Sequence, residues 1–333
     1  MDLYSGMEYV YTVYKEKSFT KAAKKLFIAQ PSLSARIKHI EEKLGYPIFD
    51  RGAKPVALTE CGKRYIDSIE KMMIIENEFT DYLEDLENPK VGKIVIGGDS
   101  QYISYVLPPV LADFNEMYPH VHLKLVEESP GNLLTAVQRD EVDIVLTGLP
   151  LNTQDFESFG CGRECVLLAV PATNKVNEKL KKYCLTYENI CRKEHLNGGC
   201  VPVSLRMFSG EMFVLTEPKK YTRTVAEKLF QNEKMYPQIT MEADNAMTAY
   251  SITCSGFGIS LVSDVLACGR GKNQAVVYYK LPLKYSSREI CFAWKAERYL
   301  TKAMQEFLEI SRRKVLNQIN SEYSFIEQIS DLL

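Results

Sequence analysis

The chain has 333 residues, of which 46% are hydrophobic and 25% charged, and this length predicts two or three domains. The apolar content excludes a chain disordered throughout, and the scattered 18 glycines and 14 prolines exclude a collagen-like repeat. No apolar run is long enough to span a membrane, and the first residues show no leader pattern. The nine cysteines, an odd number without framework spacing, indicate free thiols. We therefore expect a cytoplasmic protein without a membrane partner.

The net charge of −2 conceals a basic segment near the N-terminus. Between Lys15 and Lys54, ten basic residues stand against four acidic ones, an excess of six positive charges. A basic segment on a slightly acidic protein is typical of a phosphate-binding module joined to another domain. A solvated helix face has a similar composition, so charge alone leaves both interpretations open.

The first 45 residues predict a helix-turn-helix. Residues 3–16 repeat apolar side chains at helical spacing, and Ser18 is a natural N-cap for a second, short helix. Pro31 suits the first position of a third helix, which Gly45 ends as a C-cap. This third helix carries an inward apolar stripe, which consists of Leu33, Ile37, Ile40 and Leu44.

Polar and basic groups lie off that stripe, as a helix that enters the major groove requires. Gln30 is suited to reading adenine and Arg36 to reading guanine, while residues 46–59 predict a two-stranded wing with basic residues at its tip. The candidate DNA-binding residues are Ser18, Thr20, Gln30, Pro31, Ser32, Ser34, Arg36, Lys38, Arg51 and Lys54.

Several segments of this region together resemble the winged helix-turn-helix of LysR-type transcriptional regulators. They are Ser18-Phe19-Thr20-x-Ala22-Ala23-x-x-Leu26, Gln30-Pro31-Ser32-Leu33-Ser34, Ile40-Glu41-x-x-Leu44-Gly45, and Phe49-x-Arg51 with Leu58-Thr59-x-x-Gly62. The resemblance is dense over residues 1–65 and implies a module that binds double-stranded DNA. Ala29 departs from the family, which often has serine there, and we expect it to weaken one turn or backbone contact without changing the fold.

A long helix is predicted over residues 59–88, before a break at Pro89. Its apolar residues form a seven-residue pattern that Glu76 interrupts, namely Tyr65, Ile69, Met72, Phe79, Leu83 and Leu86. This seam fits either a coiled coil with a second chain or packing against the chain's own wing. The resemblance favours the first alternative, because this segment is the dimerising linker helix of the family, whose members usually form tetramers from pairs of dimers.

From Val91 onward, strands and helices alternate in a βαβαβ order, which predicts a parallel, doubly wound sheet. The motifs Tyr118-Pro119-x-Val121 and Gly256-Phe257-Gly258-Ile259 resemble the LysR effector-binding domain, which is similar to periplasmic solute-binding proteins. The resemblance reaches about residue 300 and implies an α/β fold with two lobes around a cleft. The expected lobes are 91–162 with 267–300, and 163–266. The expected domains are 1–58 (winged helix-turn-helix), 59–89 (linker helix), 90–300 (effector domain) and 301–333 (helical tail).

Ligands in such sheets bind where strands end and helices begin. Hydroxyl, amide and backbone N–H groups at those positions suit a small anion such as a carboxylate. The candidate effector-binding residues are Ser100, Gln101, Gly131, Asn132, Thr147, Gly148, Thr216, Arg223 and Asn245. Each of them is equally explained as a helix cap, and Arg223 also as an ion-pair partner of Glu227.

The chain shows no motif for catalysis, a metal or a cofactor, and we expect none of them. His120 and His122 alternate on a wet strand face without further ligands. Peroxide-sensing LysR members carry a cysteine pair after a second-lobe strand, but residues 218–230 contain none here. We therefore expect buried or idle thiols.

The sequence thus predicts a one-component transcription factor, in which an effector changes the placement of the lobes and so the geometry of the bound DNA. The partners implied are an operator duplex, a small molecule and a second copy of the chain, with RNA polymerase as a further candidate. A redox-sensing regulator that uses Cys191 and Cys200 is the main alternative. An enzyme on the same scaffold is a weaker one, because no acid, base or nucleophile constellation is visible.

Overall fold

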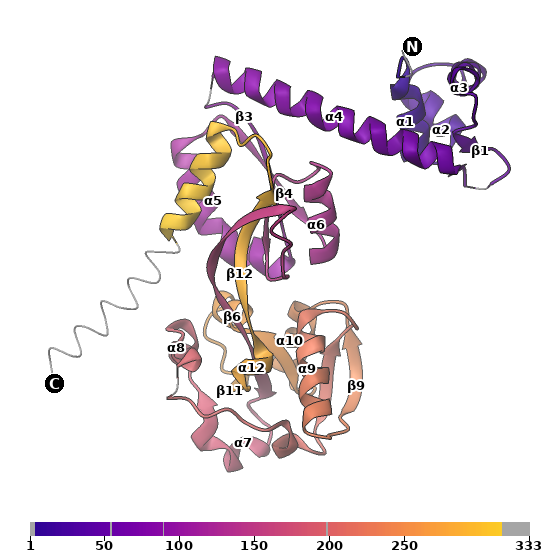
Figure 1. Cartoon of the computed structure of the whole chain (residues 1–333). Helices are drawn as coiled ribbons and strands as arrows, with labels where there is room; N and C mark the ends of the chain where they lie inside the picture. Colours follow the sequence, from indigo (N-terminus) through magenta and orange to yellow (C-terminus); the bar gives the residue numbers. More distant parts are fainter. Residues whose placement is uncertain (1–3, 54, 89, 198, 315–333) are drawn as a thin grey trace. The chain divides into compact units, whose positions relative to one another are not determined.

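A computed structural model describes residues 4–53, 55–88, 90–197 and 199–314 of the chain (Figure 1). The chain divides into two compact units, Met1–Glu84 and Asp85–Leu333. The predicted DNA contact Lys54 and the tail beyond residue 314 lie outside the described residues.

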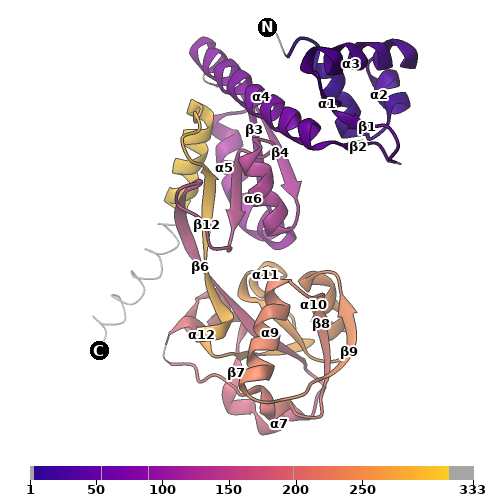
Figure 2. The same ribbon diagram turned by 45° about the vertical axis from the view of Figure 1, so that its right-hand side comes forward.

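The first unit is the predicted winged helix-turn-helix (Figure 2). Its core joins the apolar faces of all four helices, including Val13, Ala23, Ile37 and Ile66, and confirms the inward stripe of the third helix. Ser18 caps the second helix by accepting a hydrogen bond from the amide of Lys21. The elements are α1 (Met7–Glu16), α2 (Phe19–Lys25), α3 (Gln30–Leu44), the hairpin β1 (Phe49–Asp50) and β2 (Ala57–Leu58), and α4 (Glu60–Glu87).

The wing and the start of α4 pack so closely that only glycine fits at position 62. A Cβ atom on Gly62 would lie 2.0 Å from the carbonyl oxygen of Ile48. The Thr59 hydroxyl donates to the Pro47 carbonyl at 2.6 Å and accepts from the Gly62 amide at 2.9 Å. On the other side, the Glu41 carboxylate of α3 accepts from the Ile48 amide at 2.8 Å. These contacts fix the base of the wing to α3 and α4.

The second unit begins inside α4, where the carboxylate of Asp85 accepts from the Tyr299 hydroxyl at 2.8 Å. Its first lobe is built on a parallel sheet, β4–β3–β5, to which β12 adds in antiparallel orientation. The βαβαβ prediction is confirmed. The elements are β3 (Gly92–Gly98), the π-helix η1 (Tyr102–Val106), α5 (Leu107–Met117), β4 (Val121–Glu127), α6 (Pro130–Gln138) and β5 (Ile144–Thr147).

A helix over residues 302–314 also belongs to the first lobe. Its apolar side chains Ala303, Phe307 and Ile310 are buried with Phe114 and Phe292 in one core. Phe307 meets both of these aromatic rings edge-on, at centroid distances of 5.5 and 6.1 Å. The described part of the tail therefore docks on the first lobe of its own chain.

Two long strands connect the lobes, β6 (Phe156–Pro171) and β12 (Ser287–Lys295) (Figures 1 and 2). The first half of β6 pairs with β12, and its second half pairs with β10 and β11. The remaining second-lobe elements are α7 (Val176–Lys179), η2 (Lys181–Tyr183), β7 (Cys184–Leu185), α8 (Tyr187–Cys191), η3 (Glu194–Leu196), η4 (Leu205–Phe208), β8 (Met212–Thr216), α9 (Tyr221–Asn232), β9 (Gln238–Ala243), α10 (Ala246–Cys254), β10 (Ser260–Ser263), α11 (Asp264–Gly269), β11 (Val276–Lys280) and α12 (Leu283–Ser286).

The lobe boundary expected near residue 267 is wrong by about one strand and two short helices. Strand β11 pairs with β6 and β7, and Tyr279 and Leu281 are buried in the second-lobe core with Phe213. The chain returns to the first lobe only at β12. The alternation of apolar and polar residues in this segment is compatible with either lobe, and so the sequence analysis assigned the segment to the wrong one.

Candidate nucleic-acid interface and effector site

The outer face of α3 is free of the core and carries the predicted polar groups. Leu33, Ile37 and Ile40 are buried, and the residues between them face solvent because helical spacing alternates the two faces. Ala29, the departure from the family pattern, serves as N-cap of α3 without a side-chain hydrogen bond, and the helix still forms. The exposed predicted residues are Gln30, Pro31, Ser32, Arg36 and Lys38 on α3, with Thr20 on α2.

Arg36 is positioned by a residue that the sequence analysis missed. Its guanidinium lies over the ring of Tyr9, 4.7 Å from the centroid, and donates to the Tyr9 hydroxyl at 2.6 Å. Tyr9 belongs to α1, so the recognition helix is tied to the first helix through this pair. The arginine remains exposed, and its orientation is set before any ligand binds.

Arg51, in the loop between β1 and β2 of the wing, is held in a similar way. It pairs with the Glu41 carboxylate at 3.0 Å, and its guanidinium lies 5.5 Å from the centroid of the Phe19 ring. It also donates to the half-buried hydroxyl of Ser34 at 3.4 Å. Ser34 and Arg51 therefore act together at the junction of α3 and the wing, whereas Ser18 is engaged as a helix cap.

The seven-residue seam of α4 divides into a buried and an exposed part. Tyr65 and Ile69 are buried in the core of the first unit. For these two residues the structure therefore agrees with packing inside the chain, the alternative to a coiled coil. From Met72 onward one side of the helix exposes its apolar side chains, and Ile75 and Phe79 are 67% and 61% accessible. An apolar hollow of about 440 Å³ lies here, lined by Met7, Met72, Ile75, Glu76 and Phe79. The exposed apolar residues of α4 are Met72, Ile75, Phe79, Tyr82, Leu83 and Leu86.

In the second unit, a buried polar cluster joins the two lobes. Glu164 of β6 is completely buried and pairs with Arg288 of β12 at 2.6 Å. The Tyr102 hydroxyl of the first lobe donates at 2.9 Å to Glu164 Oε2, the same oxygen that accepts from Arg288. Gln101 donates to Glu164 Oε1 at 2.6 Å and accepts from the second-lobe residue Ser263 at 2.6 Å. Residues from both lobes and both connecting strands thus meet in one hydrogen-bonded cluster around the Glu164 carboxylate.

Two further groups border this cluster. The guanidinium of Arg288 stacks on the ring of Tyr221, 3.7 Å from its centroid. The Tyr221 hydroxyl is buried and has no hydrogen-bond partner among the residues that the structure describes. Burial, reinforced by the negative charge of Glu164, raises the pKa of Asp99 to about 6. Sequence reasoning missed Asp99, Tyr102, Glu164, Tyr221 and Arg288, because no local pattern shows that distant strands bring them together.

The predicted effector residues divide into those near the cluster and those with other roles. Gln101 belongs to it, and Gly148 borders Arg288 so tightly that a Cβ atom there would lie 2.5 Å from the guanidinium Nε. Thr147 is buried and its hydroxyl accepts from the amide of Leu149. Arg223 forms ion pairs with Glu227, which the sequence analysis gave as an alternative, and with Glu242, which it did not foresee.

The remaining predicted residues are engaged by neighbours within their own lobe. Ser100 donates to Glu127, and Asn132 donates to Glu128 at 3.1 Å. Thr216 shares a hydrogen bond with Thr222 at 2.9 Å, and Asn245 caps α10. Gly131 lies in the first turn of α6 with open space beside it.

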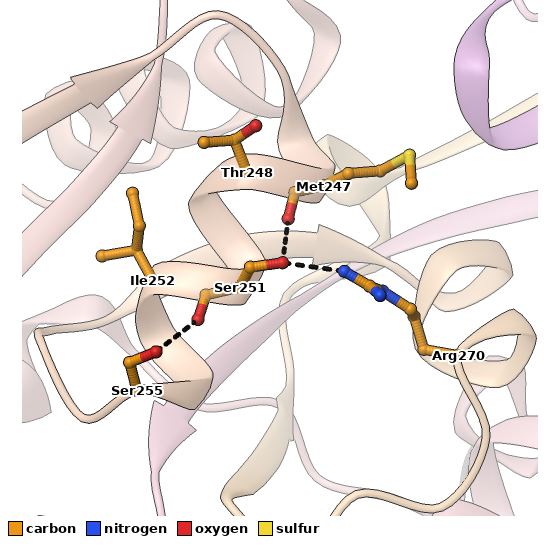
Figure 3. Close-up of a pocket in the computed structure, with 6 residues that line it drawn as sticks. All are labelled: Met247, Thr248, Ser251, Ile252, Ser255 and Arg270. Carbon is orange, nitrogen blue, oxygen red and sulfur yellow. Dashed lines mark hydrogen bonds between the residues drawn. The ribbon is translucent and has the colours of Figure 1, made fainter.

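A hollow of about 420 Å³ is lined by residues of α10, by Ser255 and by Arg270, and by none of the residues of this cluster (Figure 3). Arg270 donates to the Ser251 hydroxyl at 2.8 Å, which in turn donates to the Met247 carbonyl at 2.9 Å. Arg270, Ser251 and Ser255 of the hollow therefore bind one another and the helix backbone.

Within the described residues, no group of three His, Cys, Asp or Glu side chains is placed to bind a metal ion. None of the helices in the part of the chain that the structure describes has both the length and the apolar content needed to cross a bilayer.

Comparisons with known proteins agree with this architecture. Residues 5–63 match the family model "Bacterial regulatory helix-turn-helix protein, lysR family", and residues 87–181 and 189–315 match the model "LysR substrate binding domain". The HTH-type transcriptional regulator YcgK of Bacillus subtilis (strain 168) is 29% identical over 309 residues, which are 93% of this chain and 94% of that protein.

Two solved structures share the fold over nearly their full lengths. Full-length CbnR in complex with its target DNA aligns with a TM-score of 0.61 at 17% identity, covering 94% of this chain and 99% of that one. Full-length BenM aligns with a TM-score of 0.53 at 22% identity, covering 96% and 98%.

Proposed function

Because the chain belongs to the LysR family of DNA-binding transcriptional regulators, we propose that it binds an operator as a dimer through the outer face of α3. We further propose that a small effector binds beside the Glu164–Arg288 pair. The single observation that supports the DNA contact is the exposed polar face of α3, held rigid by the buried stripe beneath it. The family relationship supports a regulator rather than an enzyme.

In this proposal, Gln30 and Arg36 contact base edges, and Arg51 contacts the phosphate backbone together with Lys54. Bidentate contacts from arginine to guanine contribute about 1–3 kcal/mol of discrimination, whereas phosphate contacts act on every sequence alike. The Tyr9 contact presets the guanidinium of Arg36, which reduces the entropy lost on binding.

The test compares Arg36→Ala and Arg51→Ala with Arg163→Ala, an exposed arginine of the second unit. Binding of each protein to its operator and to a scrambled duplex is measured by fluorescence anisotropy over a range of salt concentrations. Arg36→Ala is expected to lose affinity for the operator only, and Arg51→Ala to weaken both duplexes and reduce the salt slope by about one. If both variants bind like Arg163→Ala, the assigned face is wrong.

The effector proposal rests on the charges around the cluster. Arg288 is already neutralised by Glu164, and the predicted donors Ser100 and Asn132 are hydrogen-bonded to Glu127 and Glu128. A free anion would meet more carboxylates than cations at this place. We therefore propose an effector with an ammonium or another cationic group, such as an amino acid or an amine, in place of the carboxylate that the sequence suggested.

A thermal-shift screen of amines, amino acids and organic acids tests this charge assignment. A stabilising amine or amino acid whose effect is lost in Ser100→Ala and kept in Ser255→Ala supports the site and its charge. If simple carboxylic acids stabilise the protein and amines do not, the proposed charge of the effector is wrong, while the proposed location of the site still holds.

The proposed assembly is a dimer that pairs into a tetramer in the cytoplasm, with RNA polymerase as a partner at the promoter.

A further inference from the structure

Two cysteines that are far apart in the sequence meet on the surface of the second lobe. The Sγ atom of Cys191, the last residue of α8, lies 2.8 Å from the Sγ atom of Cys268 in α11. Cys191 is exposed and Cys268 is half-buried. The sequence hypothesis joined Cys191 with Cys200, but the structure brings it to Cys268 instead. A disulfide bond is about 2.05 Å long, so the two sulfur atoms need to approach by less than about 1 Å.

We propose that Cys191 and Cys268 form a reversible disulfide that senses hydroperoxides, a modification that goes beyond effector-controlled DNA binding. The Cys191 thiolate attacks one peroxide oxygen, which breaks the O–O bond and leaves a sulfenic acid and one molecule of water or alcohol. The Cys268 thiol then attacks the sulfenic sulfur, forms the S–S bond and releases a second molecule, water. Two thiols are oxidised by two electrons, and one peroxide is reduced.

The roles of the two thiols follow from their surroundings. Burial and the neighbouring Cys191 raise the pKa of the Cys268 thiol well above its ordinary range. Cys191 is accessible to a peroxide, whereas Cys268 is sheltered and lies beside it. Cys191 is therefore the attacking group and Cys268 the resolving group.

A buried ionic cluster next to the pair holds α8 and α11 together. The Asp264 carboxylate, one turn before Cys268, accepts from Lys193 at 2.8 Å and lies 2.8 Å from Nε2 of His195. Both partners lie in the segment that follows α8, two and four residues after Cys191. On the other side, the Tyr187 hydroxyl donates to the Cys268 carbonyl at 3.2 Å. Because α8 and α11 are already fixed, closing the disulfide requires little rearrangement of the backbone.

Helix α11 connects this pair to the proposed effector site. Its N-cap Ser263 donates to Gln101 of the first lobe, which bonds Glu164. At its other end, Gly269 lies against Tyr105 of the first lobe so closely that a Cβ atom would be 2.3 Å from the ring. A disulfide at Cys268 ties α11 to α8 and so restrains a helix that contacts the first lobe at both ends. Oxidation is therefore expected to change operator affinity through the lobes.

Peptide mapping of the full-length protein tests the bond itself. Digestion with trypsin and proteases that cleave at Glu and Asp yields Asn189–Arg192 and Asp264–Arg270, each of which contains one cysteine. After mild hydrogen peroxide treatment and alkylation, these peptides are expected to be joined with the loss of two hydrogens, and separate again after dithiothreitol. Two separately alkylated peptides, or a bond from Cys191 to Cys200, would overturn the proposal.

Operator binding by the reduced and oxidised forms tests the consequence. Oxidised wild-type protein is expected to differ from the reduced form severalfold in operator Kd, and Cys191→Ser and Cys268→Ser to show no difference. Cys200→Ser, at a half-buried cysteine outside the pair, is the matched control and keeps the response. If the Cys191–Cys268 disulfide forms but operator affinity does not change, the proposed coupling through α11 is wrong. Because the mapping needs no DNA, its result stands even if the proposed operator contact fails.

Discussion

At the scale of single residues, the cluster between the lobes contains one carboxyl group with an unusual proton affinity. Asp99 has its pKa raised to about 6 by burial and by Glu164, with Arg288 opposing the shift. Its folded-state pKa thus lies above the unfolded value near 3.8. The stabilisation that comes from protonating Asp99 is complete below the unfolded value and is lost as the pH rises through 6.

Asp99→Asn mimics the protonated form and keeps the oxygen that accepts from the Tyr102 amide. We expect this variant to be more stable than the wild type at pH 7.5 by about 1–2 kcal/mol, after allowance for partial solvent access. The difference should narrow as the pH falls through 6 and disappear near 4. Thermal unfolding across this pH range measures it, with the exposed Asp113→Asn as the control. A gap that does not depend on pH would contradict the assignment.

The residue scale is also where sequence reasoning stopped short. Side chains on one helix face, such as Gln30 and Ser32, were predicted because helical periodicity is local information. Glu164 and Arg288 meet across 124 positions of chain, and only the antiparallel register of β6 and β12 places them together. The predicted cap positions were real, as Asn245 shows, but a capping residue need not face the effector.

At the scale of elements, the contact between the wing and α4 depends on a missing side chain. Alanine is the better helix former by about 1 kcal/mol, so propensity alone predicts that Gly62→Ala stabilises the protein. The 2.0 Å approach to the Ile48 carbonyl predicts the opposite, because the Cβ atom would push the wing from α4. We expect a net loss of about 2–4 kcal/mol in the first unit.

Hydrogen exchange of the α3 amides and calorimetry measure this loss. Gly131→Ala is the matched control, since it also lies in the first turn of a helix but has nothing within 4 Å of the added atom. The control is expected to be neutral or stabilising by up to about 1 kcal/mol. If Gly62→Ala and Gly131→Ala change the stability equally, the wing moves to accommodate the added carbon without a measurable cost.

Element types were predictable from the sequence where local signals were strong, and boundaries between lobes were not. The helix ending at Gly45 was correct, because the left-handed φ of 77° that closes it favours glycine. Strand β11 was assigned to the wrong lobe, because Val276 and Tyr278 have the alternation of any half-buried strand. Tertiary pairing, rather than pattern, decides which sheet such a strand joins.

At the scale of the whole molecule, the exposed half of α4 is the surface that we propose for self-association. Met72, Ile75, Phe79, Tyr82 and Leu86 alternate at spacings of three and four, the pattern of a coiled-coil seam. The sequence pattern included Tyr65 and Ile69, which the first unit buries for its own core. A single chain leaves the rest of the seam in water, which favours its burial against a second copy.

Phe79→Glu places a charge in the middle of this seam and is expected to convert the proposed dimer largely to 38.0 kDa monomers at micromolar concentration. Asn77→Glu adds the same charge to an exposed position of the same helix, outside the seam, and should leave the assembly unchanged. Sedimentation velocity distinguishes the two. Because two half-sites bound together gain from their effective concentration, the monomeric variant should also bind a two-site operator no more tightly than a single half-site. A Phe79→Glu protein that remains dimeric would assign self-association to another surface and leave the apolar face of α4 without its proposed partner.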